Sequence, residues 1–429
     1  MQKSKIEKIP FLDTLYQWVL ALSQLFFPVV GLFSSKFKRF IVGRVDWRSR
    51  LRQSMNVLQT GSFPKSPVVL FHCASVGEFE QARPVIEKLH SELPGHRMVL
   101  SFFSPSGFEL RKNYASADLV TYLPLDTKSN VKDFLDAIDP TLVVITKYEF
   151  WPNFLLECHN RLIPVVSISA VFRKSHFYFK PWGSFFLHAL RTVHHFFVQD
   201  QDSKAFLEKV GITNCTVSGD TRFDRVISIR EKSVPVAEVE QFVADRPAMV
   251  VGSAWPEDMK ILKPIIQKYK SKLSFVIVPH EVDPSSLQTI SDFLPEHARL
   301  SSWNGATSAS VLLVDKMGML SRIYASGMVA WVGGAYGKGL HNILEAAVYG
   351  LPVFFGNKSY QKFREAKELL AMGSAFAITN AAELEMHLEQ FLLDSNYSEK
   401  LKSISEKYVH DNKGATEIIV RFLQANLNS

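Results

Sequence analysis

Cysteine is scarce in this chain. Only three of its 429 residues are cysteines, Cys73, Cys158 and Cys215, and they show neither a CxxC pair nor a Cys/His ligand spacing. That scarcity argues against a disulfide framework and against a zinc site. A reducing cytoplasm is the compartment that fits such a cysteine content best.

Formal charge is absent from residues 14–33, a run of 20 residues without Asp, Glu, Lys or Arg. This is about the length that crosses ~30 Å of hydrocarbon as a helix, and basic residues flank it on both sides. No small-residue cleavage site follows, so a cleaved signal peptide is not expected. We predict a membrane-anchor helix within residues 1–45. Insertion into the membrane interface and a buried soluble helix stay open, because polar residues and a proline interrupt the run.

Length and composition describe a globular protein of more than one domain. A chain of 429 residues exceeds what one hydrophobic core normally supports, and 47% of its residues are hydrophobic. Lysine and arginine number 49 against 42 acidic residues, which gives a net charge of +7. This charge suits an anionic partner such as a nucleotide, a phosphorylated lipid or a membrane surface.

Two series of apolar runs alternate with amphipathic segments, which is typical of parallel α/β units. The strands predicted from these runs are 68–73, 98–103, 119–123, 142–146, 165–169 and 196–199 in the first series, and 249–252, 274–278, 311–314, 329–332, 353–355 and 375–378 in the second. The first series predicts a Rossmann-like domain over residues 46–225 and the second predicts another over 247–395. A polar segment with a proline, 226–246, reads as the linker, and 396–429 reads as a helical segment that packs back on the first domain. Two Rossmann-like halves facing an interdomain cleft describe the GT-B glycosyltransferase fold, an α/β architecture.

Two carboxylates follow predicted strands of the first half. Glu78 ends the sequence FHCASVGE, where a strand passes through a small-residue turn into a helix. It could be a capping acid at that helix start or a general base that takes a proton from an acceptor hydroxyl. Glu149 belongs to YEFWPN at the end of another strand, where it either orders the turn or faces Glu78. If the two face each other, repulsion raises the pKa of one of them.

Candidate ligand residues lie in four further motifs. A loop with four glycines follows the strand at 329–332 and leads into HNILE, so we expect an anion at the loop and ribose hydroxyls at Glu345. We expect His341 and Glu345 to share one face of the following helix. Arg222, in SGDTRFD, either reaches a phosphate or sugar carboxylate or pairs with a neighbouring aspartate. Two smaller signals are the turn at 252–257, with Ser253 as a candidate helix cap, and His280 at a strand end.

Together these motifs resemble the ordered set found in Kdo (3-deoxy-D-manno-octulosonic acid) transferases. The matching elements are SVGE at 75–78, EFWPN at 149–153, GDTRFD at 219–224, GS at 252–253, and GG with HNxLE between 333 and 345. They run through nearly the whole chain. SVGE followed by EFWPN is specific to that family, whereas the glycine and HNxLE signals recur in many GT-B enzymes.

The resemblance implies transfer of Kdo from CMP-Kdo to a lipid A precursor, with inversion and without a metal or another cofactor. It implies an inner-membrane protein, in contact with anionic lipid, whose catalytic domains lie on the cytoplasmic side, and no nucleic-acid partner. Glu78 would be the general base and Glu149 a supporting acid. The residues that would hold CMP or Kdo are Arg222, Gly252, Ser253, His280, Gly333, Gly334, His341, Asn342 and Glu345.

The chain departs from the family pattern in places. Thr146-Lys147-Tyr148 stands where the family often has an acidic residue and a threonine, and Arg222 replaces a lysine. The arginine of a PRH-type motif is missing from Pro279-His280-Glu281, and Met319 replaces an acid. Two other functions therefore stay open: a GT-B enzyme that uses a UDP-sugar, such as a lipid glycosyltransferase or a 2-epimerase, and an inactive membrane-bound nucleotide-sugar-binding protein.

Overall fold

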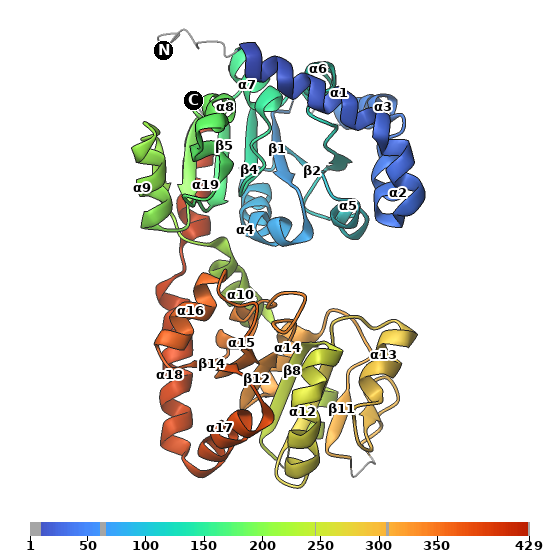
Figure 1. Cartoon of the computed structure of the whole chain (residues 1–429), viewed down its shortest axis with the longest axis vertical. Coiled ribbons are helices and arrows are strands. Elements are labelled where there is room, and N and C mark those ends of the chain that lie inside the picture. The colour runs from blue at the N-terminus through green and yellow to red at the C-terminus, as the bar shows by residue number, and fades with distance from the viewer. Residues whose placement is uncertain (1–9, 61–65, 245, 306–308, 428–429) are drawn as a thin grey trace. The chain divides into compact units, whose positions relative to one another are not determined.

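The computed structural model describes residues 10–60, 66–244, 246–305 and 309–427, which form two compact units (Figure 1). Unit 1 comprises Met1–Arg225 together with Lys413–Ser429, and unit 2 comprises Val226–Asn412. The segment 226–246, expected as a linker, carries most of helix α10 (Thr221–Lys232) and helix α11 (Ala237–Val243), and it clusters with unit 2.

Unit 1 is built on a seven-stranded, fully parallel sheet with the order β3-β2-β1-β4-β5-β6-β7. Its first connections run from β1 toward one edge, and the chain then returns to β4 on the other side of β1. A parallel sheet binds ligands at the carboxyl ends of its strands where this direction changes, here between β1 and β4. The strands are β1 (Val68–Cys73), β2 (Arg97–Phe102), β3 (Leu119–Tyr122), β4 (Leu142–Thr146), β5 (Val165–Ala170), β6 (His195–Val198) and β7 (Cys215–Val217).

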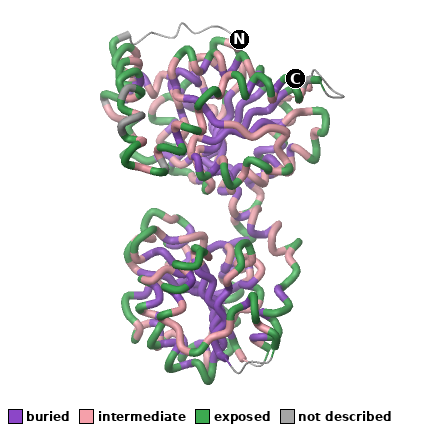
Figure 2. The backbone as a smooth tube through the Cα atoms, turned by 90° about the vertical axis from the view of Figure 1, so that its right-hand side faces the viewer, coloured by how far each residue is buried: buried purple, intermediate pink, exposed green. Residues whose placement is uncertain are grey.

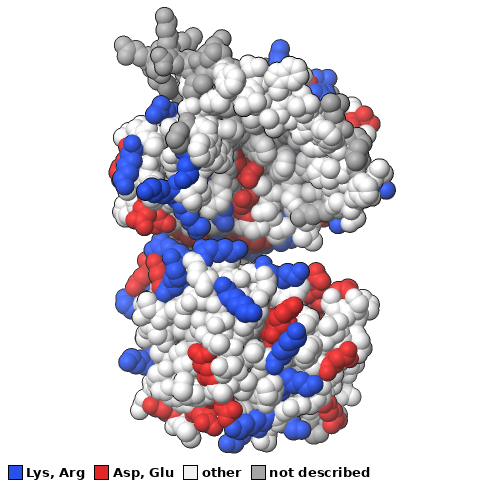
Figure 3. All heavy atoms as spheres, viewed as in Figure 1, with Lys and Arg blue, Asp and Glu red and all other residues white. Residues whose placement is uncertain are grey.

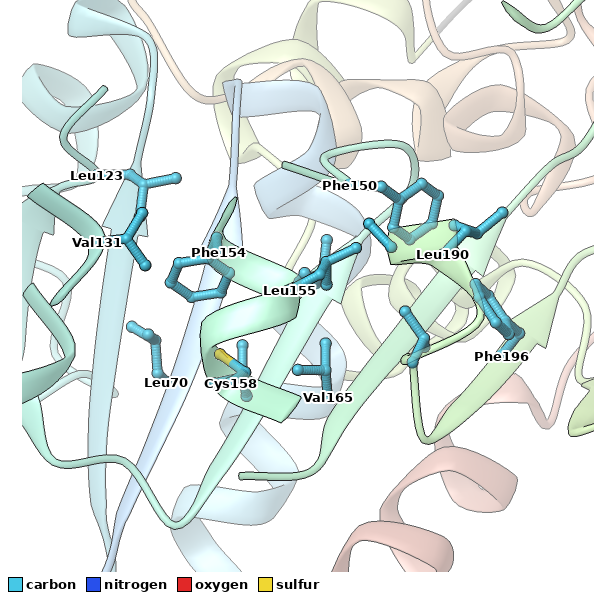
Figure 4. Packing of buried hydrophobic residues seen from close by; sticks show 14 of the residues in the cluster. Leu70, Leu123, Val131, Phe150, Phe154, Leu155, Cys158, Val165, Leu190 and Phe196 are labelled. Carbon is cyan, nitrogen blue, oxygen red and sulfur yellow. The ribbon is translucent and has the colours of Figure 1, made fainter. Parts of the chain in front are cut away.

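Helices cover both faces of this sheet, and every residue of β1 is buried. Alternate side chains serve opposite faces: Leu70 packs with Phe154 in one core, and Phe71 packs with Phe79 in the other. Figure 4 shows the first of these cores, and Figure 2 shows that buried residues concentrate in the strands. The covering helices are α4 (Val76–Glu92), α5 (Pro105–Arg111), α6 (Lys128–Ile138), α7 (Pro152–Asn160), α8 (Ser184–Leu190), α9 (Gln201–Lys209) and α19 (Ala415–Leu427).

The carboxyl-terminal part of the chain is divided between the units. Helix α18 (Ser395–Asp411) buries Leu401 in the core of unit 2, whereas α19 packs on α4 in unit 1. The carboxylate of Asp224 accepts hydrogen bonds from the amides of Gly414 (2.6 Å) and Thr416 (2.7 Å) at the start of α19. An acid at this end of a helix satisfies unpaired amides, so Asp224 anchors the returning helix.

Unit 2 repeats the same design with a second seven-stranded parallel sheet of order β10-β11-β9-β8-β12-β13-β14, so its change of direction falls between β8 and β12. The strands are β8 (Ala248–Ala254), β9 (Ser274–Pro279), β10 (Ala298–Arg299), β11 (Val311–Leu313), β12 (Val329–Val332), β13 (Val353–Gly356) and β14 (Ala375–Ile378). The remaining helices are α12 (Pro256–Tyr269), α13 (Pro284–Ser291), α14 (Leu320–Ile323), α15 (Leu344–Ala347), α16 (Arg364–Ala371) and α17 (Ala381–Leu393).

Three helices precede the first sheet: α1 (Pro10–Phe33), α2 (Ser35–Val42) and α3 (Trp47–Gln59). Tyr16 of α1 donates a hydrogen bond to the buried carboxylate of Asp126 (2.9 Å), and the Gln17 amide bonds to the Asn153 side chain (2.8 Å). Much of the rest of α1 is apolar and exposed, and few charged side chains lie over it in Figure 3. The exposed apolar side chains of α1 are those of Phe11, Leu15, Trp18, Val19, Leu22, Phe26, Val30, Leu32 and Phe33.

Among the residues that the structure describes, no helix combines the length and the apolar character that a membrane span requires. The membrane-anchor helix predicted within residues 1–45 is therefore not confirmed.

Candidate functional site

Glu78 lies at the start of α4, directly after β1, and the structure shows it as a capping residue. Its Oε2 accepts hydrogen bonds from the amides of Ala74 (2.5 Å) and Ser75 (3.1 Å), while Ser75 Oγ accepts from the Glu78 amide (3.4 Å). This reciprocal arrangement is a capping box. Across the described part of the chain, no hydrogen bond reaches Oε1 of Glu78, so one oxygen of the carboxylate is left for another partner.

Burial and a nearby cation shift the pKa of the Glu78 carboxyl in opposite directions. The side chain is only 9% exposed, and burial raises the pKa of its carboxyl because a charged group loses hydration there. The ammonium of Lys147 lowers that pKa, and so do the two amide hydrogen bonds, but burial has the larger effect. The result is a carboxylate with a raised proton affinity, which suits a general base.

Glu149 lies just beyond β4, whose register with β1 pairs His72 with Ile145. The carboxyl ends of the two strands are therefore adjacent, and the loops that follow bring Glu149 near Glu78. Burial, followed by repulsion from Glu78, raises the pKa of Glu149 to about 7. Its Oε2 accepts a hydrogen bond from the indole of Trp151 (3.0 Å).

The EFWPN segment is held in place by a buried acid. Pro152 opens α7, and the next two amides, of Asn153 and Phe154, each donate to the Asp126 carboxylate at 2.9 Å. Because Tyr16 bonds to the same carboxylate, helix α1 is fastened to the loop that carries Glu149.

Arg222 forms an ion pair, the simpler of the two roles considered for it. Its guanidinium contacts Asp220 Oδ2 through Nη2 (2.7 Å) and Nε (2.8 Å), and Gln81 donates to Oδ1 of the same acid (3.0 Å). Asp220 is buried, so this pair is not a surface salt bridge, the form in which a pair with a neighbouring aspartate was considered. Arg222 also lies in unit 1, whereas the other candidate donor-binding residues lie in unit 2.

In unit 2 the glycine loop lies directly after β12, and the close approach of its backbone explains the glycines. A Cβ on Gly333 would stand 2.2 Å from the Ser253 carbonyl oxygen, and one on Gly334 would stand 2.4 Å from the Gly339 oxygen. Gly334 also has φ +92°, a conformation that other residues rarely adopt. The buried carboxylate of Asp258 fixes the loop by accepting from the amides of Gly334 and Trp255, both at 3.0 Å.

Three rings stand beside this loop. The indole of Trp255 donates to Nε2 of His341 (3.0 Å), and His280 stacks on Trp255 with ring centroids 4.6 Å apart. Burial, followed by the neighbouring His280, lowers the pKa of His341 to about 4. His341 is therefore neutral at physiological pH, and because Nε2 accepts a hydrogen bond, its proton lies on Nδ1. That Nδ1–H is a hydrogen-bond donor suited to an anionic or sugar oxygen.

The expectation that His341 and Glu345 share a helix face was wrong, because α15 begins only at Leu344. His341 and Asn342 lie in the loop before the helix, since the glycine turn uses the residues that would have formed its first turn. Asn342 nevertheless bonds to Glu345 through its side-chain amide (3.2 Å), which orients the Glu345 carboxylate.

The expected helix cap at Ser253 was also wrong. The cap position of α12 is Trp255, and Ser253 lies in an irregular part of β8 with φ +50°. Gly252 before it has no room for a side chain, because a Cβ would stand 2.0 Å from the Tyr324 hydroxyl.

A hollow of about 260 Å³ opens beside these groups in unit 2. Its lining includes Trp255, Pro279, His280, Ser286 and Lys338. Within the described ranges no three His, Cys, Asp or Glu side chains are grouped so as to hold a metal ion.

Sequence reasoning missed three residues that shape these two sites. Asp258 follows WPE, and an acid three residues after a helix cap is the signal that could have revealed it. Trp255 was noticed only as part of a turn. Lys147 was treated as a departure from a motif, although a lysine between two strand-end carboxylates is a signal in itself.

Residues 46–225 match the family model described as 3-deoxy-D-manno-octulosonic-acid transferase (kdotransferase). A transferase of that name from Chlamydophila psittaci is 28% identical over 81% of this chain and 82% of its own length. A bifunctional glycosyltransferase/methyltransferase from Fusobacterium nucleatum is 26% identical over 87% of this chain, which spans only 58% of that relative.

Among solved structures, the UDP-GlcNAc 2-epimerase from Neisseria meningitidis covers 83% of this chain and all of its own, with a TM-score of 0.59 and 19% identity. That likeness confirms the predicted fold of two parallel-sheet α/β units, as found in GT-B proteins. The sequence matches go further than the fold, because the family model and the Chlamydophila psittaci relative carry the same name and that relative extends over both units. The chain is therefore similar to 3-deoxy-D-manno-octulosonic acid transferases over most of its length, and it is a glycosyltransferase.

Proposed function

We propose that this glycosyltransferase moves Kdo from CMP-Kdo to a lipid A precursor, with inversion at the anomeric carbon and without a metal. The observation that carries this proposal is the pair of carboxylates, buried Glu78 and half-buried Glu149, at the change of direction of the first sheet. The chain is also similar in sequence to Kdo transferases.

In the proposed reaction Glu78 removes the proton from an acceptor hydroxyl, and that oxygen attacks the anomeric carbon opposite the nucleotide. The bond from that carbon to the phosphate oxygen breaks, CMP leaves as an anion, and Glu78 keeps the proton until solvent takes it. Glu149, whose pKa is about 7, is partly protonated at neutral pH and can donate a hydrogen bond to the acceptor.

The donor would bind to unit 2. The Nδ1–H of His341, beside the glycine loop at Gly333 and Gly334, offers a hydrogen bond to the phosphate, which supports its departure as an anion. Glu345, oriented by Asn342, would accept from the ribose hydroxyls. We further propose that Gly252, Ser253 and His280 shape the sugar pocket, and that Arg222 contacts the Kdo carboxylate while it stays paired with Asp220.

A nucleotide panel tests the donor. At 100 times its Kd, a ligand that binds only the native state stabilises it by about 2.7 kcal/mol. We expect CMP to raise the melting temperature of the chain and UDP or UDP-GlcNAc to leave it unchanged. A larger rise with UDP would instead support a UDP-sugar enzyme, and no rise with any nucleotide would support neither.

We also propose that α1 lies on the inner membrane, in the interface of anionic lipid on the cytoplasmic side, where a lipid acceptor is found. Exposed apolar side chains recur along α1 with helical spacing, among them Trp18 (63% exposed) and Phe26 (62%). Helix α2 follows α1 directly, and its basic residues Lys38 and Arg39 are exposed. Their positive charge suits anionic headgroups.

The double variant Trp18→Ala, Phe26→Ala is expected to bind vesicles of 30% phosphatidylglycerol at least tenfold more weakly than the parent chain in co-sedimentation, because two aromatic anchors are lost. Leu393→Ala, which removes an apolar side chain that is 86% exposed on unit 2, serves as the matched control and should change nothing. Equal binding by all three proteins would remove α1 from the membrane contact.

A further inference from the structure

Lys147 occupies an unusual backbone position between the two strand-end carboxylates. It follows the last residue of β4 and has φ +61°, a left-handed conformation that is uncommon outside glycine. Its amide donates to the Ile168 carbonyl of β5 (3.0 Å), which ties the conformation to the neighbouring strand. Residues in such conformations persist only where the surrounding structure holds them, and they cluster at functional sites.

The register of the sheet fixes the surroundings of this lysine. Since β1 and β4 run parallel and pair His72 with Ile145, Lys147 follows β4 at the level where Ala74 follows β1. Ala74 is also the residue whose amide binds the Glu78 carboxylate. Lys147 is half-buried, and it therefore lies between the residues that hold Glu78 and those that lead into Glu149.

We propose that Lys147 is a positioning residue for the transfer reaction, whose ammonium keeps the Glu78 carboxylate ionised and oriented for proton abstraction. This inference rests on the proposed function of Glu78 as the base.

The charges around Glu78 explain why it needs such a partner. The other titratable groups that act on it or respond to its charge are Glu149 and Tyr148 from the loop after β4 and Cys73 from β1. None of these three supplies positive charge. Among the influences on Glu78, Lys147 is the strongest that favours its charged form, ahead of the two amides of its capping box. A base that stays protonated cannot accept a proton, so the lysine sets the lower limit of the working pH range.

Three substitutions test the proposal through the pH profile of kcat/KM. Lys147→Met keeps the length of the side chain and removes its charge, so the acid limb should move to higher pH. At pH 6 we expect about a tenfold loss relative to the parent chain, and at pH 9 a change of less than about twofold, with KM little altered. Lys147→Arg should restore the parent profile. Lys147→Asn, which tolerates the left-handed backbone, should behave like Lys147→Met and so exclude backbone strain as the cause.

A rise in KM with an unmoved profile would overturn the proposal and assign Lys147 to substrate binding. Equal loss at pH 6 and pH 9 would overturn it as well, because a structural defect does not depend on the charge of Glu78. Lys407→Met, at a 71% exposed side chain on α18, controls for the general loss of a positive charge.

A measurement without turnover separates this proposal from the proposed function. In the full chain labelled with ¹³C-carboxyl glutamate, the Glu78 resonance is assigned by its disappearance in Glu78→Gln and titrated in the parent and in Lys147→Met. We expect the titration midpoint of Glu78 to rise in Lys147→Met. An unchanged midpoint would overturn the role of the lysine. A raised midpoint in a chain that transfers no Kdo would keep the lysine pairing and reject the proposed reaction.

Discussion

Replacing Glu78 by glutamine is expected to lower kcat for Kdo transfer by about 10²- to 10⁴-fold, the range that a general base usually contributes. Glutamine keeps an oxygen that can accept from the Ala74 and Ser75 amides, so the start of α4 should stay capped. The loss should therefore appear in turnover, while the melting temperature and the affinity for CMP stay close to those of the parent chain.

Glu80→Gln is the matched control for this prediction. Glu80 lies two residues further along α4 and bonds to Arg111 (3.0 Å), away from the capping box. It should keep turnover within about twofold. Near-normal turnover in Glu78→Gln would show that its carboxylate is only a helix cap.

Gly334→Ala is expected to weaken CMP binding by more than about 100-fold. The new methyl group would stand 2.4 Å from the Gly339 carbonyl oxygen and 2.9 Å from the His341 ring. Residue 334 also has a φ of +92°, which alanine rarely adopts. Both the clash and the backbone conformation force the loop to move, and with it the amide that Asp258 holds. Isothermal titration with CMP measures the change, and circular dichroism checks that the chain is folded.

The same loop supplies the control. A Cβ at Gly337 meets nothing within 4 Å, and this glycine has no left-handed φ. Gly337→Ala should leave CMP affinity within about twofold. If both variants bind CMP like the parent chain, the glycine loop is not the phosphate site.

Most of the sheet architecture could be read from the sequence, because long apolar runs mark strands that are buried on both faces. The run predicted at 68–73 is β1 itself, and 142–146 is β4. The strands that were missed, β7 and β10, have three and two residues and lie at sheet edges. Segments that short carry no periodicity that distinguishes them from loops.

The contacts and burial of the site residues were harder to predict from the sequence than the strands. The position of Glu78 after β1 followed from the strand and turn pattern, and its capping role was one of two alternatives. A pair between Arg222 and a neighbouring aspartate was likewise one of two alternatives. The burial of Asp220 was not predicted, because it depends on Gln81, which lies on a helix far away in the sequence. The start of α15 was misplaced because the glycine turn extends past His341.

Both candidate sites follow from one rule of parallel sheets. In each unit the strand order changes direction beside the first strand. The residues of each candidate site follow the two strands on either side of that point. In unit 1 those loops carry Glu78 and Glu149, and in unit 2 they carry Asp258 and Gly334. Two carboxylates in one unit and a glycine loop beside His341 in the other suit a division between acceptor activation and nucleotide binding.

The most direct test is the mass of a lipid A precursor after incubation with the purified chain and freshly generated CMP-Kdo. We predict products heavier by one or more Kdo residues, formed without added metal and absent when Glu78→Gln replaces the parent chain. An unmodified precursor under conditions in which a UDP-sugar does add mass would contradict the proposed donor and the reaction built on it.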